Sequence, residues 1–388
     1  MKSRRLIVVG TLASNPYAGM AWMHMQIAAG LRRLGHDVYY FETTSAWPYD
    51  PSRGTAVDDS TYALPYIQRV AEGFGLGARW AYRRSYSDKR WFGIERSAAE
   101  DLLAHSDAVL NITGATRFAE EGLRVSRLVY VGTDPGVHEI GFAEGDPDTR
   151  TIIDEHDDCV TYGENIGKSS CPIPPLPRLR AAMRQPVLLD FWRGGPPSNS
   201  AFTTVGNWKQ AGRDLAFRGE TYFWSKHHEF LKFIDVPKRA AQPVELATGL
   251  ENLGADETKL LEENGWNLVD AHPLTLSPEP YRDYVCASRG ELTVAKDLNV
   301  RLKSGWFSER SACYLAAGRP VVTQDTGFDA VLPTGEGLFA FNSTEEILAA
   351  LETINSDYEK HSRAARAIAE EYFKAETVLG RLLGDLGL

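Results

Sequence analysis

The chain has 388 residues, of which 43% are hydrophobic, and its formal net charge is -10. This length suggests two globular domains, and the negative charge argues against nucleic acid, which is bound by clustered basic residues. The apolar run 6–9 is too short for a signal peptide, and no run is long enough to span a bilayer. We therefore expect a cytoplasmic protein with no nucleic-acid partner and no integral membrane segment.

The first half of the chain alternates between predicted strands and helices. A strand at 6–9 precedes a helix whose apolar residues recur every three or four positions from Met20 to Leu34, and Gly35 ends that helix. With the strand at 38–41 this makes a β-α-β unit, which implies a parallel sheet. The pattern continues with a helix at 98–105, strands at 108–113 and 128–131, a helix at 151–156 and a strand at 159–162. Residues 45–92 show few clear periods, and we predict helices and loops covering one face there.

A proline-rich stretch then predicts the linker between the domains. Four prolines fall between residues 172 and 177, a density that excludes a helix or a central strand. We expect one domain at 1–178, a second at 186–368, and a final helix at about 369–388 that crosses back to the first. The second half predicts strands at 202–205, 244–247, 267–270, 291–295, 320–323 and 337–341, and helices at 226–234, 251–264, 280–287, 308–317 and 344–355.

The segment 305–327 carries the most chemical information. Ser308 is a good N-cap, so the next three backbone N–H groups would point out of the helix start and form an anion site. Gly318 ends the helix, and the strand that follows carries a polar loop at its carboxyl end, where open α/β sheets bind ligands. The residues that would bind a diphosphate and sugar hydroxyls are Ser308, Glu309, Arg310, Ser311, Gln324 and Asp325. The alternative is an ordinary helix–strand unit with a polar cap and no ligand, which would show the same spacing.

Two motifs resemble those of GT-B glycosyltransferases of the bacterial family 1 and 4 type. Residues 315–322, Leu-Ala-Ala-Gly-Arg-Pro-Val-Val, are similar to the Ala-Cys-Gly-Lys-Pro-Val-Val segment of that family. Gly19, with Leu-Gly-His-Asp-Val at 34–38, resembles the glycine-rich loop and Gly-His-x-Val signature of its N-terminal domain. The resemblance implies an α/β, GT-B fold with two Rossmann-like parallel-sheet domains facing a central cleft. It also implies acceptor binding by the N-terminal domain and nucleotide-sugar binding by the C-terminal one.

The resemblance also assigns donor-binding positions. A glutamate of the family usually contacts the donor ribose, but Cys313 stands at that place, and Glu309 lies one helical turn earlier on the same face. The further donor-binding candidates that the resemblance gives are Gly206, Asn207, Trp208, Lys226, His272, Ser288 and Arg289. A solvated lysine at a helix start is the alternative for Lys226.

The catalytic candidates follow the predicted strand 128–131. Transfer to a hydroxyl with inversion needs a base, and Asp134 and His138 lie just beyond the end of that strand. The alternative is structural, because Asp-Pro-Gly at 134–136 is also a good turn sequence. On the first helix and its approach we expect Gly19, Met20 and His24 to line the acceptor side of the cleft, and His24 fits a core position as well.

Several enzyme classes lack their motifs in this sequence. There is no GxGxxG after the first strand and no GxxxxGK[ST], which argues against nicotinamide enzymes and P-loop nucleotidases. No Asp-x-Asp stands at a predicted strand end, so we expect no catalytic metal, and no cofactor besides the donor substrate.

We therefore predict a hexosyltransferase-type enzyme that moves a sugar from a UDP or dTDP sugar to a hydroxyl or similar group of a small-molecule or glycan acceptor. The alternatives are a GT-B sugar-nucleotide epimerase, a catalytically degenerate GT-B binding partner and, at this length least of all, a glycan phosphorylase. The sequence leaves a homodimer open.

Overall fold

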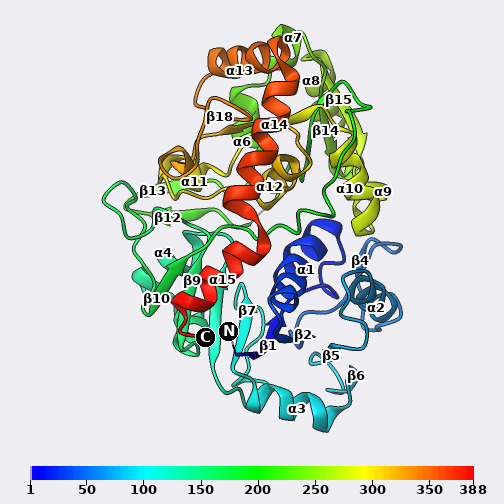
Figure 1. The fold of residues 1–388 in the computed structure, drawn as a ribbon, viewed down its shortest axis with the longest axis vertical. Coiled ribbons are helices and arrows are strands. Elements are labelled where there is room, and N and C mark those ends of the chain that lie inside the picture. The colour runs from blue at the N-terminus through cyan, green and yellow to red at the C-terminus, as the bar shows by residue number, and fades with distance from the viewer. Residues whose placement is uncertain (1, 211) are drawn as a thin grey trace.

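The computed structural model describes residues 2–210 and 212–388, which form two α/β halves built on separate sheets (Figure 1). The first sheet has eight strands, all parallel except the last. From one edge to the other they are β10 (Leu179–Ala182), β9 (Asp158–Thr161), β8 (Leu128–Gly132), β7 (Ala108–Ile112), β1 (Arg5–Val9), β2 (Asp37–Glu42), β5 (Trp80–Arg83) and β6 (Trp91–Gly93).

The second sheet has six strands, and every neighbouring pair is parallel. Their order is β15 (Trp266–Asp270), β14 (Val244–Thr248), β11 (Phe202–Val205), β16 (Gly290–Thr293), β17 (Val321–Gln324) and β18 (Leu338–Phe341). In both sheets the chain starts in the middle, builds towards one edge and then returns to build the other. Each sheet therefore has a topological switch point, between β1 and β7 in the first and between β11 and β16 in the second.

Helices connect these strands and cover the sheets, as the alternating pattern predicts. Those of the first half are α1 (Ala18–Arg33), α2 (Ala63–Gly73), α3 (Arg96–His105), α4 (Val137–Glu144) and α5 (Pro147–Asp154). Those of the second half are α6 (His227–Lys232), α7 (Val236–Arg239), α8 (Ala255–Glu263), α9 (His272–Thr275), α10 (Pro278–Ala287), α11 (Asp297–Arg301), α12 (Glu309–Ala316), α13 (Thr344–Ser356) and α14 (Tyr358–Ile368). No helix in the described part of the chain is both long and apolar enough to cross a membrane.

Two predictions about the first half are wrong. Residues 45–92 contain α2 but also β5 and β6, which extend the sheet beyond β2, and a small hairpin of β3 (Tyr49–Asp50) and β4 (Thr55–Ala56). Aromatic residues without clear alternation hid these short strands. The proline-rich stretch at 171–177 is not the linker, because it leads into β10, which pairs with β9 of the first sheet. The predicted boundary at residue 178 thus falls just before β10, the strand of that sheet that comes last along the chain.

The chain crosses between the halves twice, and the two crossings lie together. Residues after β10 lead to the second half, and α14 passes through a π-helical turn (Ala369–Phe373) into α15 (Ala375–Asp385) on the first half (Figure 1). Val187 and Lys374 form a β-bridge between the two crossings. A Cβ at Gly30 of α1 would come within 2.5 Å of the Leu379 side chain of α15, so the close packing of these helices requires glycine there.

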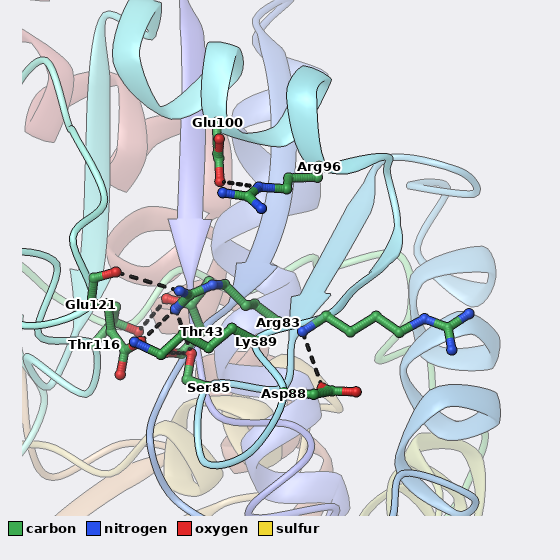
Figure 2. A network of polar contacts seen from close by, with 10 residues as sticks. Thr43, Arg83, Ser85, Asp88, Lys89, Arg96, Glu100, Thr116 and Glu121 are labelled. Carbon is green, nitrogen blue, oxygen red and sulfur yellow. Dashed lines mark hydrogen bonds and ion pairs between the residues drawn. The ribbon is translucent and has the colours of Figure 1, made fainter.

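A buried polar network fixes the loops at the carboxyl ends of β2, β5 and β7 (Figure 2). Arg83 is 7% exposed and donates to Glu121 over 2.5 Å and to the Ser85 hydroxyl over 3.0 Å. Ser85 in turn donates to the backbone carbonyl of Thr43 over 2.9 Å, and the Thr43 hydroxyl donates to that of Thr116 over 3.3 Å. The loops on this side of the first half are therefore held to one another by their own side chains.

Candidate functional site

Arg310 lies across the switch point of the second sheet. From the first turn of α12 its guanidinium donates to a Glu291 carboxylate oxygen of β16 over 2.5 Å. It also donates to the Val205 carbonyl at the end of β11 and to the Thr293 hydroxyl at the end of β16, both over 2.8 Å. The Glu291 side chain is fully buried, so this ion pair provides its compensating charge. Arg310 thereby joins the two strands that diverge at this point, and Gly206 lies beside its guanidinium.

The N-terminus of α12 presents hydrogen-bond donors at the same place. Ser308 is at the N-cap position with extended backbone, as predicted, but its side chain makes no capping hydrogen bond. The first N–H groups of the helix are therefore not satisfied by their cap residue. The Ser311 hydroxyl, which is fully buried, also lacks a hydrogen-bond partner among the described residues. A helix start with unpaired donors and a positive dipole end is suited to an anion.

Two lysines add positive charge beside Arg310. Burial, with the neighbouring charges of Arg310 and Lys296, lowers the pKa of the Lys226 ammonium well below its ordinary value. No carboxylate of the described residues lies within ion-pair distance of Lys226, whose ammonium sits 5.6 Å from the centre of the Trp306 ring. Lys296 follows β16 and lies 3.2 Å from the centre of the Trp224 ring. Basic side chains from three different segments thus lie within electrostatic reach of one another.

The loop that carries Trp306 is held between the two halves. Trp306 Nε1 donates to the Thr133 carbonyl of the first half over 3.1 Å. The Asn165 side chain, also of the first half, donates to the carbonyls of Lys303 and Gly327 over 3.1 and 2.9 Å. A Cβ at Gly305, which has a φ of +75°, would lie 2.9 Å from the Asn165 backbone nitrogen. The first half therefore shapes the approach to α12 directly.

On the first half, the structure separates the two catalytic candidates. Asp134 points across to the second half and accepts a hydrogen bond from the Lys296 ammonium over 2.6 Å. The His138 ring instead contacts its own half, where Nδ1 lies 2.5 Å from the Tyr130 hydroxyl. Burial lowers the pKa of His138, which favours the neutral imidazole. Of the two side chains, Asp134 is the one that meets the cationic cluster.

The acceptor-side candidates lie along α1. Gly19 and Met20, in its first turn, are partly exposed, whereas His24 is fully buried. His24 packs against Gly10 and Tyr40, and neither ring nitrogen has a hydrogen-bond partner among the described residues. Burial lowers the pKa of His24 to about 3, so its ring is neutral. His24 thus takes the core position that the sequence also allowed, with Gly10 of the loop after β1 packed against its ring.

The sequence matches no family model and no curated protein, but solved structures match over nearly its whole length. A sucrose-phosphate synthase from Thermosynechococcus elongatus is 12% identical, with 99% of each chain covered and a TM-score of 0.56. Anabaena HepE in complex with UDP and glucose is 12% identical, with 99% of each chain covered and a TM-score of 0.59. An alpha-glucosyltransferase in complex with UDP is 10% identical, with 100% of each chain covered and a TM-score of 0.58. The chain has the GT-B fold.

The GT-B fold was predicted from the two motifs, and the structure places most predicted donor residues at the edge of the second sheet where Arg310 lies. Asn207 is exposed beside Gly206, whereas Trp208 turns into the half, where its Nε1 donates to Glu257 over 3.1 Å. His272 begins α9 and is partly buried. Trp208 therefore supports this edge of the sheet from the interior, as a buried packing residue.

The loop after β17 is engaged with the protein itself. The Gln324 amide donates to Glu229 over 2.6 Å, and its oxygen accepts from the backbone N–H of Ala295 over 3.2 Å. Asp325 accepts from the Lys303 ammonium over 2.7 Å and from the backbone N–H of Gly327 over 2.7 Å. Both side chains fix the loops that surround α12, and contact between them and a donor sugar remains a prediction.

Two predicted donor residues lie at the wrong edge of the sheet. Ser288 and Arg289 directly precede β16, so they stand at its amino end, opposite the carboxyl end where Arg310 lies. Arg289 donates twice to the Asn355 side chain, over 2.9 and 2.7 Å, and stacks on Tyr358. Ser288 is fully buried and donates to the Tyr284 carbonyl over 2.8 Å. Both serve the packing of α10, α13 and α14.

Glu309 also has a different environment from the one expected for a ribose contact. One of its carboxyl oxygens accepts from the Gln26 side chain of α1 over 2.8 Å. Burial raises the pKa of Glu309 to about 8, so the carboxyl carries its proton near neutral pH. Glu309 therefore joins the two halves beside Cys313, whose sulfur lies 3.7 Å from the same Gln26 nitrogen.

Sequence reasoning missed Lys296, Trp224 and Trp306. Lys296 comes within three residues of the end of β16, in the position after a strand where ligand-binding residues of α/β sheets occur. That position was a usable signal. The sequence offers no signal for the two tryptophans, because their part in the site depends on which lysine packs against each ring in the folded protein.

Proposed function

We propose that this protein transfers a sugar from a nucleoside diphosphate sugar of the UDP or dTDP type to a hydroxyl or similar group of a small-molecule or glycan acceptor. One observation carries the proposal: Lys226, Lys296 and Arg310 lie within electrostatic reach of one another beside the β11/β16 switch point, and of the three only Lys296 and Arg310 have a carboxylate partner in the described part of the chain. The burial that lowers the pKa of Lys226 makes its charged form costly in the free protein, and an anion bound beside it would favour the ammonium again.

The proposed donor site follows from this charge. The diphosphate would lie between the N-terminus of α12 and the ammonium of Lys226, and Arg310 has two further N–H groups that these three hydrogen bonds do not use. These positive groups would stabilise the charge that develops on the leaving diphosphate. The similar HepE and alpha-glucosyltransferase structures contain UDP, which supports the choice of a nucleoside diphosphate.

The acceptor would bind to the first half, across from the donor. Asp134 is the carboxylate that faces the cationic cluster from that half, and it is the group we assign to take the proton of the acceptor hydroxyl. The net charge of -10 favours a small-molecule or glycan acceptor over nucleic acid. No cofactor and no metal enters this proposal, since the leaving group is stabilised by the helix terminus and the cations.

Calorimetric titration with UDP, dTDP and the corresponding monophosphates tests the donor site. We expect one diphosphate to bind, and the Lys226→Met variant to raise its Kd at least about tenfold, because a charge-assisted contact is lost. Lys360→Met is the matched control, since that lysine is half-exposed on α14 and pairs with Glu336, and neither residue belongs to the proposed site. Urea unfolding of both variants separates a loss of binding from a loss of structure, and no loss of stability is expected for Lys226→Met.

Turnover of the matching nucleotide sugar then tests the reaction. Release of the nucleoside diphosphate that rises when an acceptor is added supports transfer. Conversion of the donor into its epimer without any acceptor would show a sugar-nucleotide epimerase, and tight binding with no turnover would show a binding protein. If no nucleoside diphosphate binds the wild-type protein, the proposed function is refuted.

A further inference from the structure

The ion pair between Asp134 and Lys296 joins the two halves at the centre of the proposed site. Asp134 follows β8 of the first half, Lys296 follows β16 of the second, and the carboxylate oxygen lies 2.6 Å from the ammonium. The Lys296 side chain is 11% exposed, whereas that of Asp134 is 42% exposed. The lysine is therefore fixed in the interior and the carboxylate is at the more open end of the pair.

Aromatic packing limits where the Lys296 ammonium can go. It lies 3.2 Å from the centre of the Trp224 ring, a short cation–π contact. Trp224 is itself held by two hydrogen bonds, from its backbone N–H to Asp214 over 2.9 Å and from Nε1 to the Gln210 side chain over 3.2 Å. An ammonium anchored on a fixed ring can exchange a partner on its open side without leaving the site.

Lys296 lies within electrostatic reach of the basic side chains that would bind the diphosphate. The charge of Lys296 is among the causes that lower the pKa of Lys226, after burial and Arg310, so the three cations lie within electrostatic reach of one another. Asp134 offsets part of this repulsion, and it is the partner that an incoming polyanion would compete with. An anion that binds beside Asp134 repels its carboxylate, so each of the two anions weakens the contact of the other with the ammonium.

We propose that the donor diphosphate and Asp134 compete for Lys296, so that donor binding draws the ammonium to the diphosphate and releases the Asp134 carboxylate as the base. The inference rests on the proposed function. In the reaction the acceptor's hydroxyl proton moves to Asp134 and the acceptor oxygen bonds to the anomeric carbon. The bond from that carbon to the diphosphate breaks, and its electron pair stays on the diphosphate. The Asp134 carboxylate is thus free to accept a proton only when a donor is bound, so the acceptor hydroxyl is activated only when it has a donor to attack.

This competition predicts that one substitution changes donor binding and sugar transfer in opposite directions. The free energy of breaking the Asp134–Lys296 pair is subtracted from the donor's binding free energy, and coupling of this kind is reciprocal. Removing the carboxylate with Asp134→Asn should therefore tighten diphosphate binding while it slows sugar transfer. A residue that merely holds the halves together would weaken binding when removed, or leave it unchanged.

The test is calorimetric titration of UDP, or of whichever nucleoside diphosphate binds the wild-type protein, into four variants. We expect Asp134→Asn to lower the Kd about fivefold or more, Lys296→Met to raise it, and Asp134→Asn to have no effect in the Lys296→Met background. Asp148→Asn is the charge control, because it removes one exposed carboxylate of the same half that makes no ion pair with residues 2–210 or 212–388. Its Kd should equal that of wild type.

The remaining outcomes separate the two proposals. An unchanged or higher Kd for Asp134→Asn, with wild-type binding intact, overturns the competition and leaves the donor site standing. A Kd lowered equally by Asp148→Asn would show an effect of net charge alone and would also overturn it. Failure of the wild-type protein to bind any nucleoside diphosphate refutes the proposed function itself. Thermal melts of each variant show that the protein tested is folded.

Discussion

The two sheets each bury a glutamate, and the two are neutralised in different ways. Glu42, at the end of β2, accepts hydrogen bonds from the backbone N–H groups of Ala13 and Ser14 and from the Tyr40 hydroxyl. Burial raises its pKa to about 8, so it keeps its proton near neutral pH. Glu291, on β16, instead pairs with the Arg310 guanidinium.

This difference shows how the two edges divide their roles. The edge of the second half is built from basic side chains, with Arg310, Lys226 and Lys296 within electrostatic reach of one another beside the switch point. The edge of the first half around Glu42 and His24 is built from neutral polar groups under a covering loop. Asp134 is the first-half carboxylate that meets the cations. A nucleoside diphosphate therefore fits the second half and an uncharged hydroxyl acceptor fits the first.

The largest effect is expected for Arg310→Met. This change leaves Glu291 fully buried without its counter-charge, which costs about 3–5 kcal/mol of unfolding free energy. Urea unfolding measures the loss, and the double variant Arg310→Met/Glu291→Gln should recover most of it, because the buried charge is then gone as well. Arg96→Met is the control, since Arg96 is 76% exposed and pairs with Glu100 one helical turn away. Equal losses in the two single variants would contradict the paired-charge account of this edge.

A smaller effect is expected where the two halves meet at Gln26. The side chain of this fully buried residue accepts from the backbone N–H of Leu188 and from Trp192 Nε1, and it donates to Glu309. Gln26→Leu leaves these groups without partners, at a cost of about 2–3 kcal/mol. Chemical unfolding monitored by tryptophan fluorescence reports the change. Gln68→Leu, on the exposed face of α2, should be close to wild type, and a similar loss there would count against the role of Gln26.

The smallest effect is expected for Glu42→Gln, and it should depend on pH. A carboxyl whose folded pKa lies above its unfolded value of 4.5 binds more protons in the folded protein, so stability falls as pH rises from that value towards about 8. The Gln variant cannot ionise and should lose less stability between about pH 5 and about pH 8. Thermal melts across that range measure the slope. Parallel slopes for the variant and wild type would show that Glu42 is already ionised in the folded protein over this range and that its pKa is not raised.

The local features of the site could be predicted from the sequence because they depend on neighbouring residues. The start of α12 at Ser308, its end at Gly318 and the strand after it follow from a cap residue, a helical period and a glycine. The error at Arg289 was avoidable. Residues that precede a parallel strand lie at the opposite edge from those that follow it, and the strand was predicted to begin at Glu291. The GT-B fold followed from the two motifs and from the repeated alternation of strands and helices.

The sequence by itself determined two parallel α/β halves, the strand ends that carry polar loops and the helix whose N-terminus opens on one of them. Only the tertiary structure decided that Lys296 meets Asp134, that Gln26 binds Glu309, and that Arg310 pairs with Glu291. The physical reason is that electrostatic and hydrogen-bond energies depend on distance and burial. For groups as far apart in sequence as Asp134 and Lys296, the packing of one half against the other sets both.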